Sequence, residues 1–457
     1  MRRVPSATRL VGSARLTEQT LGLGIDTGGT FTDAAIVDVA SNSVVAAAKA
    51  PTTHYDLAVG IMDALDRLPP ELLAQVELVS LSTTLATNAI VEGNGAPVCL
   101  VLIGYDEGLI RNYNLDRLLP TANIAYVGGG HRSTGEEAAP LDESALEQVA
   151  RKYAGSVAAI AVSGFFAVRN PEHELRARDV LAELTGLPIT CGHELASELD
   201  SVLRAATCAL NASLVRLLRD LMLSVQRALA SLSVDAPLMV VRGDGSLMRV
   251  EMALERPVET ILSGPAASVV GARALTQLDD MLVVDIGGTT TDIAVVRGGL
   301  PLLNNEGARV GRWRTLVRAV QTTSSGLGGD SQVSLDGSTP LQVGPRRVIP
   351  LAFLAEGHPE VKRDLVRMMI ASGAPSPAES AFFTLSRSVD GLQYSDVETR
   401  ILKALELGPR SLWWLAQRDP WAHLYLSRPN TLERTGVVLR GGFTPTDALH
   451  VSGGFVA

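Results

Sequence analysis

The sequence predicts an α/β protein with two related lobes and a small, mostly helical C-terminal unit. Three observations support this fold class. Short aliphatic segments alternate with longer segments of helical periodicity, which is typical of layered α/β structure. One glycine-rich motif occurs twice, each time directly after an aliphatic segment. From residue 396 onward the pattern is predominantly helical.

The first lobe is expected to cover residues 21–195, after a flexible N-terminal tail at 1–20. The tail is rich in arginine and poor in acids, so an organelle transit peptide is the alternative interpretation. Aliphatic and β-branched runs bounded by glycine or polar residues predict strands within the lobe. These runs are 21–25, 34–39, 44–48, 98–103 and 157–162.

The second lobe is expected to cover residues 196–395. It opens with the longest helical signal in the chain, which starts near Ser197 and carries leucines on one face at a spacing of about 3.6 residues. Strands are predicted at 238–241, 281–284 and 293–296.

The C-terminal unit, residues 396–457, carries helical patterns at 397–405 and 412–416, separated by Gly408-Pro409. The order of elements resembles a winged helix. Its charges nearly balance, and a duplex reader usually carries a basic stripe, so a packing or capping module is the favoured interpretation. The chain stops soon after a new element begins, which is consistent with a truncated chain or a short family member.

Composition excludes several classes of function. The chain has 457 residues, with 40 Lys plus Arg against 49 Asp plus Glu, and this acidic balance disfavours nucleic-acid binding. The longest uncharged stretch, Tyr153–Val168, is shorter than the roughly 20 apolar residues that span a membrane. We therefore expect no membrane or nucleic-acid partner. The three scattered cysteines favour a reducing, cytoplasmic location, and a homo-oligomer stays open.

Cysteine and histidine spacing indicates no dedicated metal site. The three cysteines are scattered without a CxxC pair, and the histidines show no HxH or HxxxH pattern. The only metal expected from the sequence is Mg²⁺ that is held together with a nucleotide.

The repeated motif is the strongest functional signal. Residues 26–33 and 285–292 both read D-x-G-G-T-x-T-D and share six positions. Glycines allow a tight turn whose N–H groups can approach a phosphate, and threonine hydroxyls add donors. A carboxylate beside phosphate must hold Mg²⁺ or a metal-bound water, because it would otherwise repel the phosphate. Two such hairpins facing one another would hold a nucleotide from both sides.

The motif assigns roles to named residues. Asp26 and Asp285 are the candidate catalytic carboxylates and the candidate Mg²⁺-binding residues. The candidate phosphate-binding residues are Gly28, Gly29, Thr30, Thr32, Gly287, Gly288, Thr289 and Thr291. Neither a P-loop nor a Rossmann turn fits, because the glycines lie between two predicted strands and no GxxxxGK[ST] motif is present.

These residues resemble the actin-like ATPase superfamily and, more narrowly, the A-type subunit of the hydantoinase/oxoprolinase family. The resemblance covers residues 21–350 and, more weakly, Thr444–Asp447. It rests on segments that occur in the family's order: Gly24–Asp33, Ser82–Ala89, Asn170–Glu174, Arg204, Thr207, Asn211-Ala212, Leu262–Ala266, Asp285–Asp292, Gly326–Ser331 and Gly344–Arg346.

The resemblance implies duplicated actin-like (ribonuclease H-like) lobes with a nucleotide cleft between them. It implies that Gly326, Gly328 and Gly329 form the turn on which adenosine rests, with ATP and Mg²⁺ as cofactors. It further implies ATP-dependent opening of a small cyclic amide such as a hydantoin, 5-oxoproline or lactam, together with a B-type hydantoinase/oxoprolinase subunit. A small-molecule kinase of the same fold and a non-catalytic, nucleotide-gated binding protein are the alternatives.

Overall fold

The computed structural model describes residues 20–29, 31–53, 57–334, 341–370, 380–386 and 394–453. The described residues form two compact units. The first comprises the described parts of Met1–Val283 together with Ala294–Gln321. The second comprises Val284–Ile293 together with the described parts of Thr322–Ala457. The tail expected at 1–20 lies almost entirely outside the described residues, and the lobe boundaries at 195 and 395 remain predictions.

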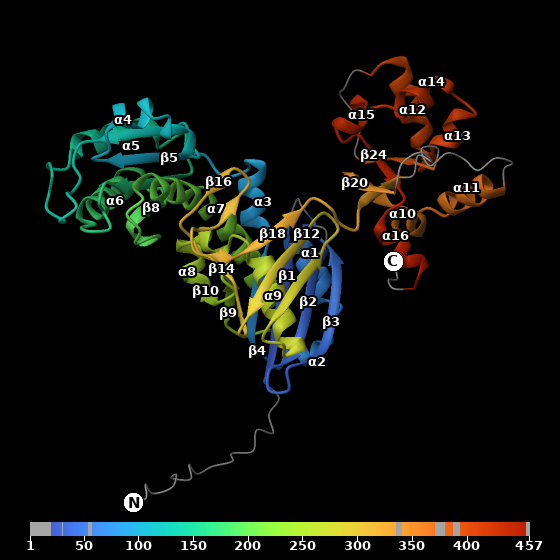
Figure 1. Ribbon diagram of the computed structural model, residues 1–457, viewed down its shortest axis with the longest axis horizontal. Coiled ribbons are helices and arrows are strands. Elements are labelled where there is room, and N and C mark those ends of the chain that lie inside the picture. The colour runs from blue at the N-terminus through green and yellow to red at the C-terminus, as the bar shows by residue number, and fades with distance from the viewer. Residues whose placement is uncertain are drawn as a thin grey trace, which may run out of the picture. The chain divides into compact units, whose positions relative to one another are not determined.

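The first unit contains a six-stranded mixed sheet with the order β10-β9-β4-β1-β2-β3 (Figure 1). β1, β2 and β3 pair antiparallel in sequence order, β4 and β9 run parallel to β1, and β10 pairs antiparallel with β9. The strands are β1 (Leu21–Thr27), β2 (Phe31–Asp38), β3 (Ser43–Pro51), β4 (Val76–Thr83), β9 (Leu238–Val241) and β10 (Leu247–Arg249). The strands predicted in 21–48 and at 238–241 are therefore confirmed.

Alternating side chains fix which face of this sheet is the core. Leu21, Leu23 and Ile25 of β1 are buried on one face, where they pack with α1 (Leu57–Leu65) and the C-terminal half of α7 (Ser201–Ser231). The short helix α2 (Pro70–Leu73) leads into β4.

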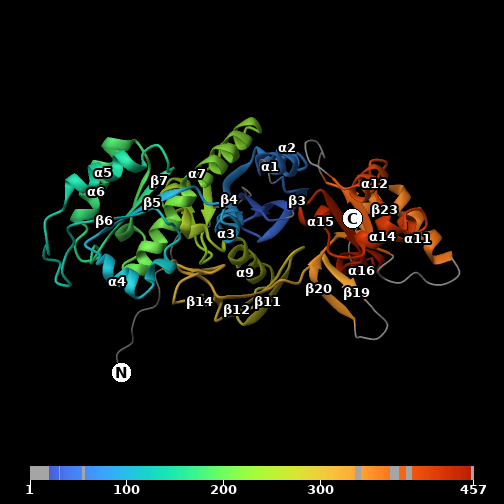
Figure 2. The same cartoon turned by 90° about the horizontal axis from the view of Figure 1, so that it is seen from above.

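A second sheet of the same unit is fully parallel, with the order β6-β5-β7-β8. Its strands are β5 (Val98–Ile103), β6 (Ile124–Val127), β7 (Ala159–Gly164) and β8 (Ile189–Cys191). One face packs against α5 (Glu143–Tyr153) and α6 (Glu172–Thr185), which lie side by side in Figure 2, and the other face packs against α7. Because both faces are covered, β5 is a continuous aliphatic run, as the sequence predicted. The aliphatic part of β7 is Ala159–Val162, so this strand begins two residues later than predicted and extends to Gly164.

Helix α7 has 31 residues and is long and apolar enough, by length and composition alone, to cross a membrane. In this protein 67% of its most apolar stretch is buried, and it contacts both sheets. Asp200 caps its first turn by accepting a hydrogen bond from the Leu203 amide at 3.0 Å. The helix therefore begins at Ser201, slightly later than the periodicity indicated.

Further elements complete the first unit. α3 (Leu85–Glu92) follows β4, and α9 (Ser263–Thr276) packs against β4 and β9. The remaining elements are α4 (Glu107–Asn112), η1 (Leu115–Leu118), η2 (Gly192–Glu194), α8 (Val250–Glu255), η3 (Pro257–Thr260), β13 (Leu300–Pro301), β14 (Leu303–Asn304), β15 (Arg309–Val310), β16 (Trp313–Arg314) and β17 (Ala319–Val320).

The boundaries between the two units fall within two strands, β11 (Met281–Ile286) and β12 (Thr291–Arg297). β12 pairs with β11, β13 and β18 (Thr322–Ser325). In the second unit β19 (Ser331–Ser334) pairs with β20 (Gln342–Arg347), and a small sheet has the order β21-β24-β22-β23. Its strands are β21 (Ile349–Pro350), β22 (Phe382–Leu385), β23 (Arg410–Ser411) and β24 (Val438–Gly442).

The helices of the second unit confirm the mostly helical C-terminal segment. α12 (Asp396–Leu405) starts with a capping box between Ser395 and Glu398, and α13 (Leu412–Ala416) occupies the predicted residues. The other helices are α10 (Leu351–Gly357), α11 (Pro359–Ile370), α14 (Pro420–Leu426), α15 (Thr431–Arg434) and α16 (Pro445–Val451). α12 to α15 pack around β22 and β24, which indicates that this segment has its own core.

Candidate functional site

The first repeated motif forms the β1–β2 hairpin. Its turn is closed by a hydrogen bond from the Gly28 amide to the Phe31 carbonyl at 3.0 Å, and no atom of the described residues, chain neighbours aside, lies within 4 Å of a Cβ built on Gly29. Thr30 lies outside the described residues. Asp26 is paired with Asp33 across the hairpin, which places its carboxylate at the end of β1.

Asp26 is held by the neighbouring parallel strand. Ser82 of β4 stands opposite Asp26 in register, and its hydroxyl donates to Asp26 Oδ1 at 2.5 Å. A hydrogen bond to a carboxylate is stronger than one between neutral groups, so it fixes the rotamer of Asp26.

Two helices begin beside this carboxylate. α3 starts after Thr84, whose amide donates to the Thr27 carbonyl at 3.1 Å. α9 starts at Ser263, whose hydroxyl donates to the Thr83 carbonyl at 3.0 Å, and a Cβ on Gly264 would lie 3.9 Å from Asp26 Oδ1. Helix N-termini carry partial positive charge and unpaired N–H groups. The two helix starts therefore place partial positive charge beside the Asp26 carboxylate.

The second repeated motif forms the β11–β12 hairpin with the same closing bond. The Gly287 amide donates to the Thr290 carbonyl at 2.9 Å, matching the bond from Gly28 in the first motif. The carboxylate of Asp292 accepts hydrogen bonds from Ser324 and from Thr290. The sequence repeat is thus a repeat of turn geometry.

The glycine-rich segment near residue 328 lies directly on this second turn. The Gly329 amide donates to the Gly287 carbonyl at 2.9 Å, and the Asp330 amide donates to the Gly288 carbonyl at 2.7 Å. A Cβ on Gly328 would lie 2.6 Å from both of those carbonyl oxygens, so only glycine fits there. At Gly326 no atom of the described residues lies within 4 Å of such a Cβ, so no close contact requires glycine there, and its role beside adenosine stays a prediction.

Two predicted phosphate-binding threonines are engaged within the protein. Thr32 is fully buried, and its hydroxyl lies 3.1 Å from that of Thr52, which donates to the Gly28 carbonyl at 3.0 Å. Thr291 donates to the Leu327 carbonyl at 2.8 Å. Both hydroxyls stabilise a turn in this structure, and their contact with phosphate stays a prediction, as do the roles of Gly288 and Thr289.

Sequence reasoning missed the contribution of the C-terminal helix α16. Thr446 donates from its amide and its hydroxyl to the Gly329 carbonyl, at 3.2 and 3.0 Å. Asp447 accepts hydrogen bonds from Thr444 and from the Ala352 amide. Burial raises the pKa of Asp330, opposed by Arg347 and reinforced by Asp447. The only available signal was the weak resemblance of Thr444–Asp447 to the family.

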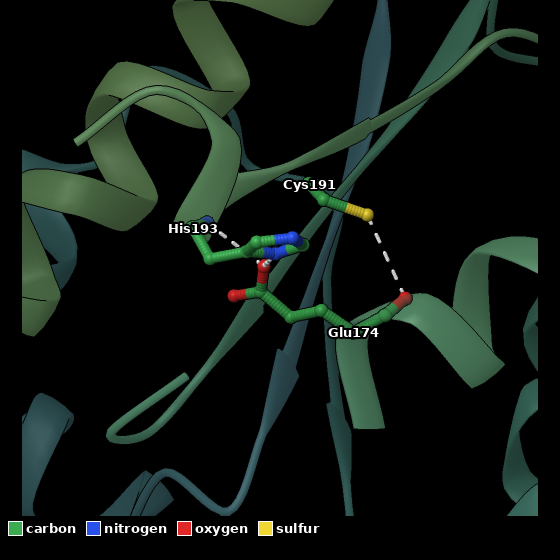
Figure 3. Close-up of side chains that lie close together, drawn as sticks. All are labelled: Glu174, Cys191 and His193. Carbon is green, nitrogen blue, oxygen red and sulfur yellow. Dashed lines mark hydrogen bonds and ion pairs between the residues drawn. The ribbon is translucent and has the colours of Figure 1, made fainter. Parts of the chain in front are cut away.

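A separate polar cluster was also missed. It lies at the carboxyl ends of β7 and β8 and contains Glu174, Cys191, His193 and Arg204 (Figure 3 shows the first three). Burial is the largest cause of the raised pKa of Cys191, and Glu174 adds to it. No short spacing motif joins these residues, because the chain contributes them from two helices and a strand end.

The chain matches two models of one family. Residues 22–185 match the hydantoinase/oxoprolinase N-terminal region, and residues 204–349 match the hydantoinase/oxoprolinase model. Both repeated hairpins lie within the matched residues.

Curated relatives agree with these matches. The caprolactamase subunit alpha of Pseudomonas jessenii is 33% identical over 358 residues, covering 72% of this chain and 51% of the relative. The acetophenone carboxylase gamma subunit of Aromatoleum aromaticum is 27% identical over 364 residues, covering 71% of this chain and 49% of the relative. The chain therefore spans about half the length of the curated relatives it matches.

Solved structures show a related fold. The ATP-dependent caprolactamase of Pseudomonas jessenii aligns with a TM-score of 0.57 at 30% identity, covering 71% of this chain and 51% of that chain. Nucleotide-free acetone carboxylase aligns with a TM-score of 0.61 at 23% identity, covering 72% of this chain and 51% of that chain, and supports the fold alone. With two family models together matching most of its residues, the chain belongs to the hydantoinase/oxoprolinase family.

Proposed function

We propose that this chain is the ATP-binding subunit of a cytoplasmic enzyme that opens a small cyclic amide of the hydantoin, 5-oxoproline or lactam type at the expense of ATP. The observation that carries the proposal is the repeated hairpin. Two D-x-G-G-T-x-T-D turns close with the same amide-to-carbonyl bond, and each follows a strand whose penultimate residue is an aspartate. The proposal includes actin-like lobes that hold the nucleotide from two sides.

The first hairpin fits a nucleotide phosphate with Mg²⁺. The N-termini of α3 and α9 supply partial positive charge, and the position beside Gly29 is open. Asp26 supplies the hard oxygen ligand that Mg²⁺ prefers, directly or through water. Ser82 donates to one oxygen of this carboxylate and so helps to orient it.

The two aspartates and the glycine turns would act by positioning the phosphates of the nucleotide. ATP, when bound, supplies a phosphoryl group that turns the amide oxygen from a poor leaving group into a good one. Asp26 and Asp285 would hold charge close to the phosphates, and the glycine turns would bring main-chain N–H groups to the phosphate oxygens. The segment around Gly328 would support the adenosine side, because it packs onto the second turn.

The relatives named as subunits support a partner. The caprolactamase relative is an alpha subunit and the acetophenone carboxylase relative is a gamma subunit, so we propose that a B-type hydantoinase/oxoprolinase subunit completes this enzyme. The purified chain alone should then show little opening of cyclic amides. Amide hydrolysis at ordinary enzyme rates by the chain alone would contradict the two-subunit proposal.

The test of nucleotide binding is a thermal unfolding series with Mg²⁺ and either ADP or a non-hydrolysable ATP analogue. A ligand present at 100 times its Kd stabilises the folded state by about 2.7 kcal/mol, so the melting temperature should rise with nucleotide concentration. Inorganic phosphate with Mg²⁺ serves as the control for an anion effect. The absence of any shift at millimolar nucleotide would overturn the proposal.

A further inference from the structure

The polar cluster at the carboxyl end of the parallel sheet contains three metal-ligating side chains of different chemistry. Cys191 is the last residue of β8, His193 follows two residues later in η2, and Glu174 is the third residue of α6 (Figure 3). The carboxyl ends of parallel strands are where α/β sheets commonly place ligands. The cluster therefore occupies a typical ligand position that the nucleotide proposal does not use.

Their ligand atoms already lie close together. One carboxylate oxygen of Glu174, the thiol sulfur of Cys191 and a ring nitrogen of His193 are all within 4.8 Å of one another. Glu174 Oε2 is 2.6 Å from His193 Nδ1, and the Cys191 thiol donates only a long contact of 3.6 Å to the Glu174 main-chain carbonyl. A modest adjustment of side chains would bring all three to one ion.

The carboxylate of Glu174 is placed by the main chain. Its Oε1 accepts a hydrogen bond from the Gly164 amide at 2.6 Å, and its Oε2 accepts one from the His193 amide at 2.9 Å. A Cβ on Gly192 would lie 3.3 Å from Glu174 Oε1, so the glycine between Cys191 and His193 lets β8 approach the carboxylate closely. The oxygen ligand is therefore held in position without any metal.

This buried carboxylate lacks a permanent cation. Glu174 is fully buried, and a buried charge is normally paired or bound to a metal. Among the described residues, its ion-pair partner within 4.0 Å is His193, whose ring is charged only when protonated. Arg204, also fully buried, instead donates to the carbonyls of Gly164 and Glu198. Arg204 therefore does not pair with the Glu174 carboxylate, and a cation bound at the cluster would compensate the negative charge of that carboxylate.

We propose that Glu174, Cys191 and His193 form a binding site for Zn²⁺. A mixed set of carboxylate oxygen, thiolate sulfur and imidazole nitrogen suits zinc, whereas Mg²⁺ and Ca²⁺ prefer oxygen ligands alone. Binding replaces the thiol proton of Cys191 and any proton on the coordinating nitrogen of His193, and the displaced protons leave to solvent. Three protein ligands leave one tetrahedral position for water, and access is from the His193 side, whose side chain is 17% exposed.

The test uses cobalt as a spectroscopic substitute for zinc. The chain is stripped of metal with a chelator and titrated with Co²⁺, and the expected result is a thiolate-to-cobalt charge-transfer band that saturates at one equivalent and disappears when Zn²⁺ is added. Cys191→Ser should abolish the band. Cys208→Ser is the matched control, because Cys208 is also fully buried but donates to the carbonyls of Val162 and Thr190, and it should keep the band.

A second variant keeps the test valid if Cys191→Ser fails to fold. His193→Gln changes a partly exposed ring and should weaken Zn²⁺ binding, measured by competition with a chromophoric chelator, by about tenfold or more. The thermal shift with Mg²⁺ and ADP should stay parental in both variants, which separates this site from nucleotide binding. The absence of a cobalt band in the parent, or a band that persists in Cys191→Ser, would show that these three side chains do not form a metal site.

Discussion

Ser82 donates a hydrogen bond to Asp26 at 2.5 Å across the parallel pair β4–β1. The bond connects the first residue of the repeated motif to a strand that ends at Thr83, beside the starts of α3 and α9. The orientation of the Asp26 carboxylate is therefore set by a residue outside the motif, and Ser82 becomes a positioning residue for the proposed chemistry.

Ser82→Ala should lower ATP turnover by about tenfold or more. A hydrogen bond to a charged group is worth about 1.5–3 kcal/mol, and its loss removes one restraint on the Asp26 carboxylate. Steady-state ATPase assays with the partner subunit present would measure the effect. Ser80→Ala is the matched control, since Ser80 lies on the same strand and opposite Gly24, and it should stay within a few-fold of the parent. Equal losses in both variants would point to a general defect of β4.

Asp26→Asn and Asp285→Asn should each reduce ATP turnover by two orders of magnitude or more. Electrostatic positioning of phosphoryl transfer contributes about 3 kcal/mol or more, and asparagine keeps the size of the side chain while removing its charge. Nucleotide affinity, measured by calorimetry, should fall much less than turnover. Asparagine is itself a good turn former, so turnover close to that of the parent in both variants would reduce the motif to a turn.

Gly328→Ala should destabilise the protein and weaken nucleotide binding. The new methyl group would lie 2.6 Å from the carbonyl oxygens of Gly287 and Gly288, so the segment must move away from the second hairpin. Gly326→Ala is the control for stability alone, because no atom of the described residues lies within 4 Å of the added carbon. Thermal unfolding with and without Mg²⁺ and ADP reports both effects. A parental response from Gly328→Ala would show that this contact does not support the site.

His131 should make the folded state sensitive to acid. Burial lowers its pKa, His173 lowers it further, and Glu172 and Glu137 oppose the shift. Because the native state then binds fewer protons than the unfolded state, stability is complete above the unfolded pKa of about 6.5 and falls as pH drops from there to the native pKa. Denaturant unfolding at several pH values should show this loss, and His131→Gln should reduce it. An NMR titration midpoint for His131 at or above about 6.5 would contradict the argument.

Periodicity predicted most of the first unit. The strands at 98–103 and 238–241 match β5 and β9, because uninterrupted aliphatic runs of strand length have few alternatives. The repeat also predicted two matching hairpins, since its glycines fix a turn regardless of the surrounding fold. The predicted ends of helices and strands were less accurate than their positions. The long helix begins at Ser201 and not near Ser197, because the cap at Asp200 decides its start.

Contacts between distant segments could not be predicted. Ser82 and Asp26 meet through parallel pairing of β1 and β4, and Thr446 meets Gly329 although 117 positions separate them. Glu174 and His193 likewise come from a helix start and a strand end. In each case the tertiary fold, and no local spacing, creates the contact.

Helix α7 has a mechanical consequence for the first unit. Its N-terminal half lies in the core of the parallel sheet, and its C-terminal half lies in the core of the six-stranded sheet. One continuous helix of 31 residues, with a rise of about 1.5 Å per residue, thus packs against both sheets and couples them mechanically. Neither sheet can lose its core without exposing half of helix α7 to solvent. The amides at the centre of α7 should accordingly exchange with solvent only when both sheets open together, and the first unit should melt in a single cooperative step.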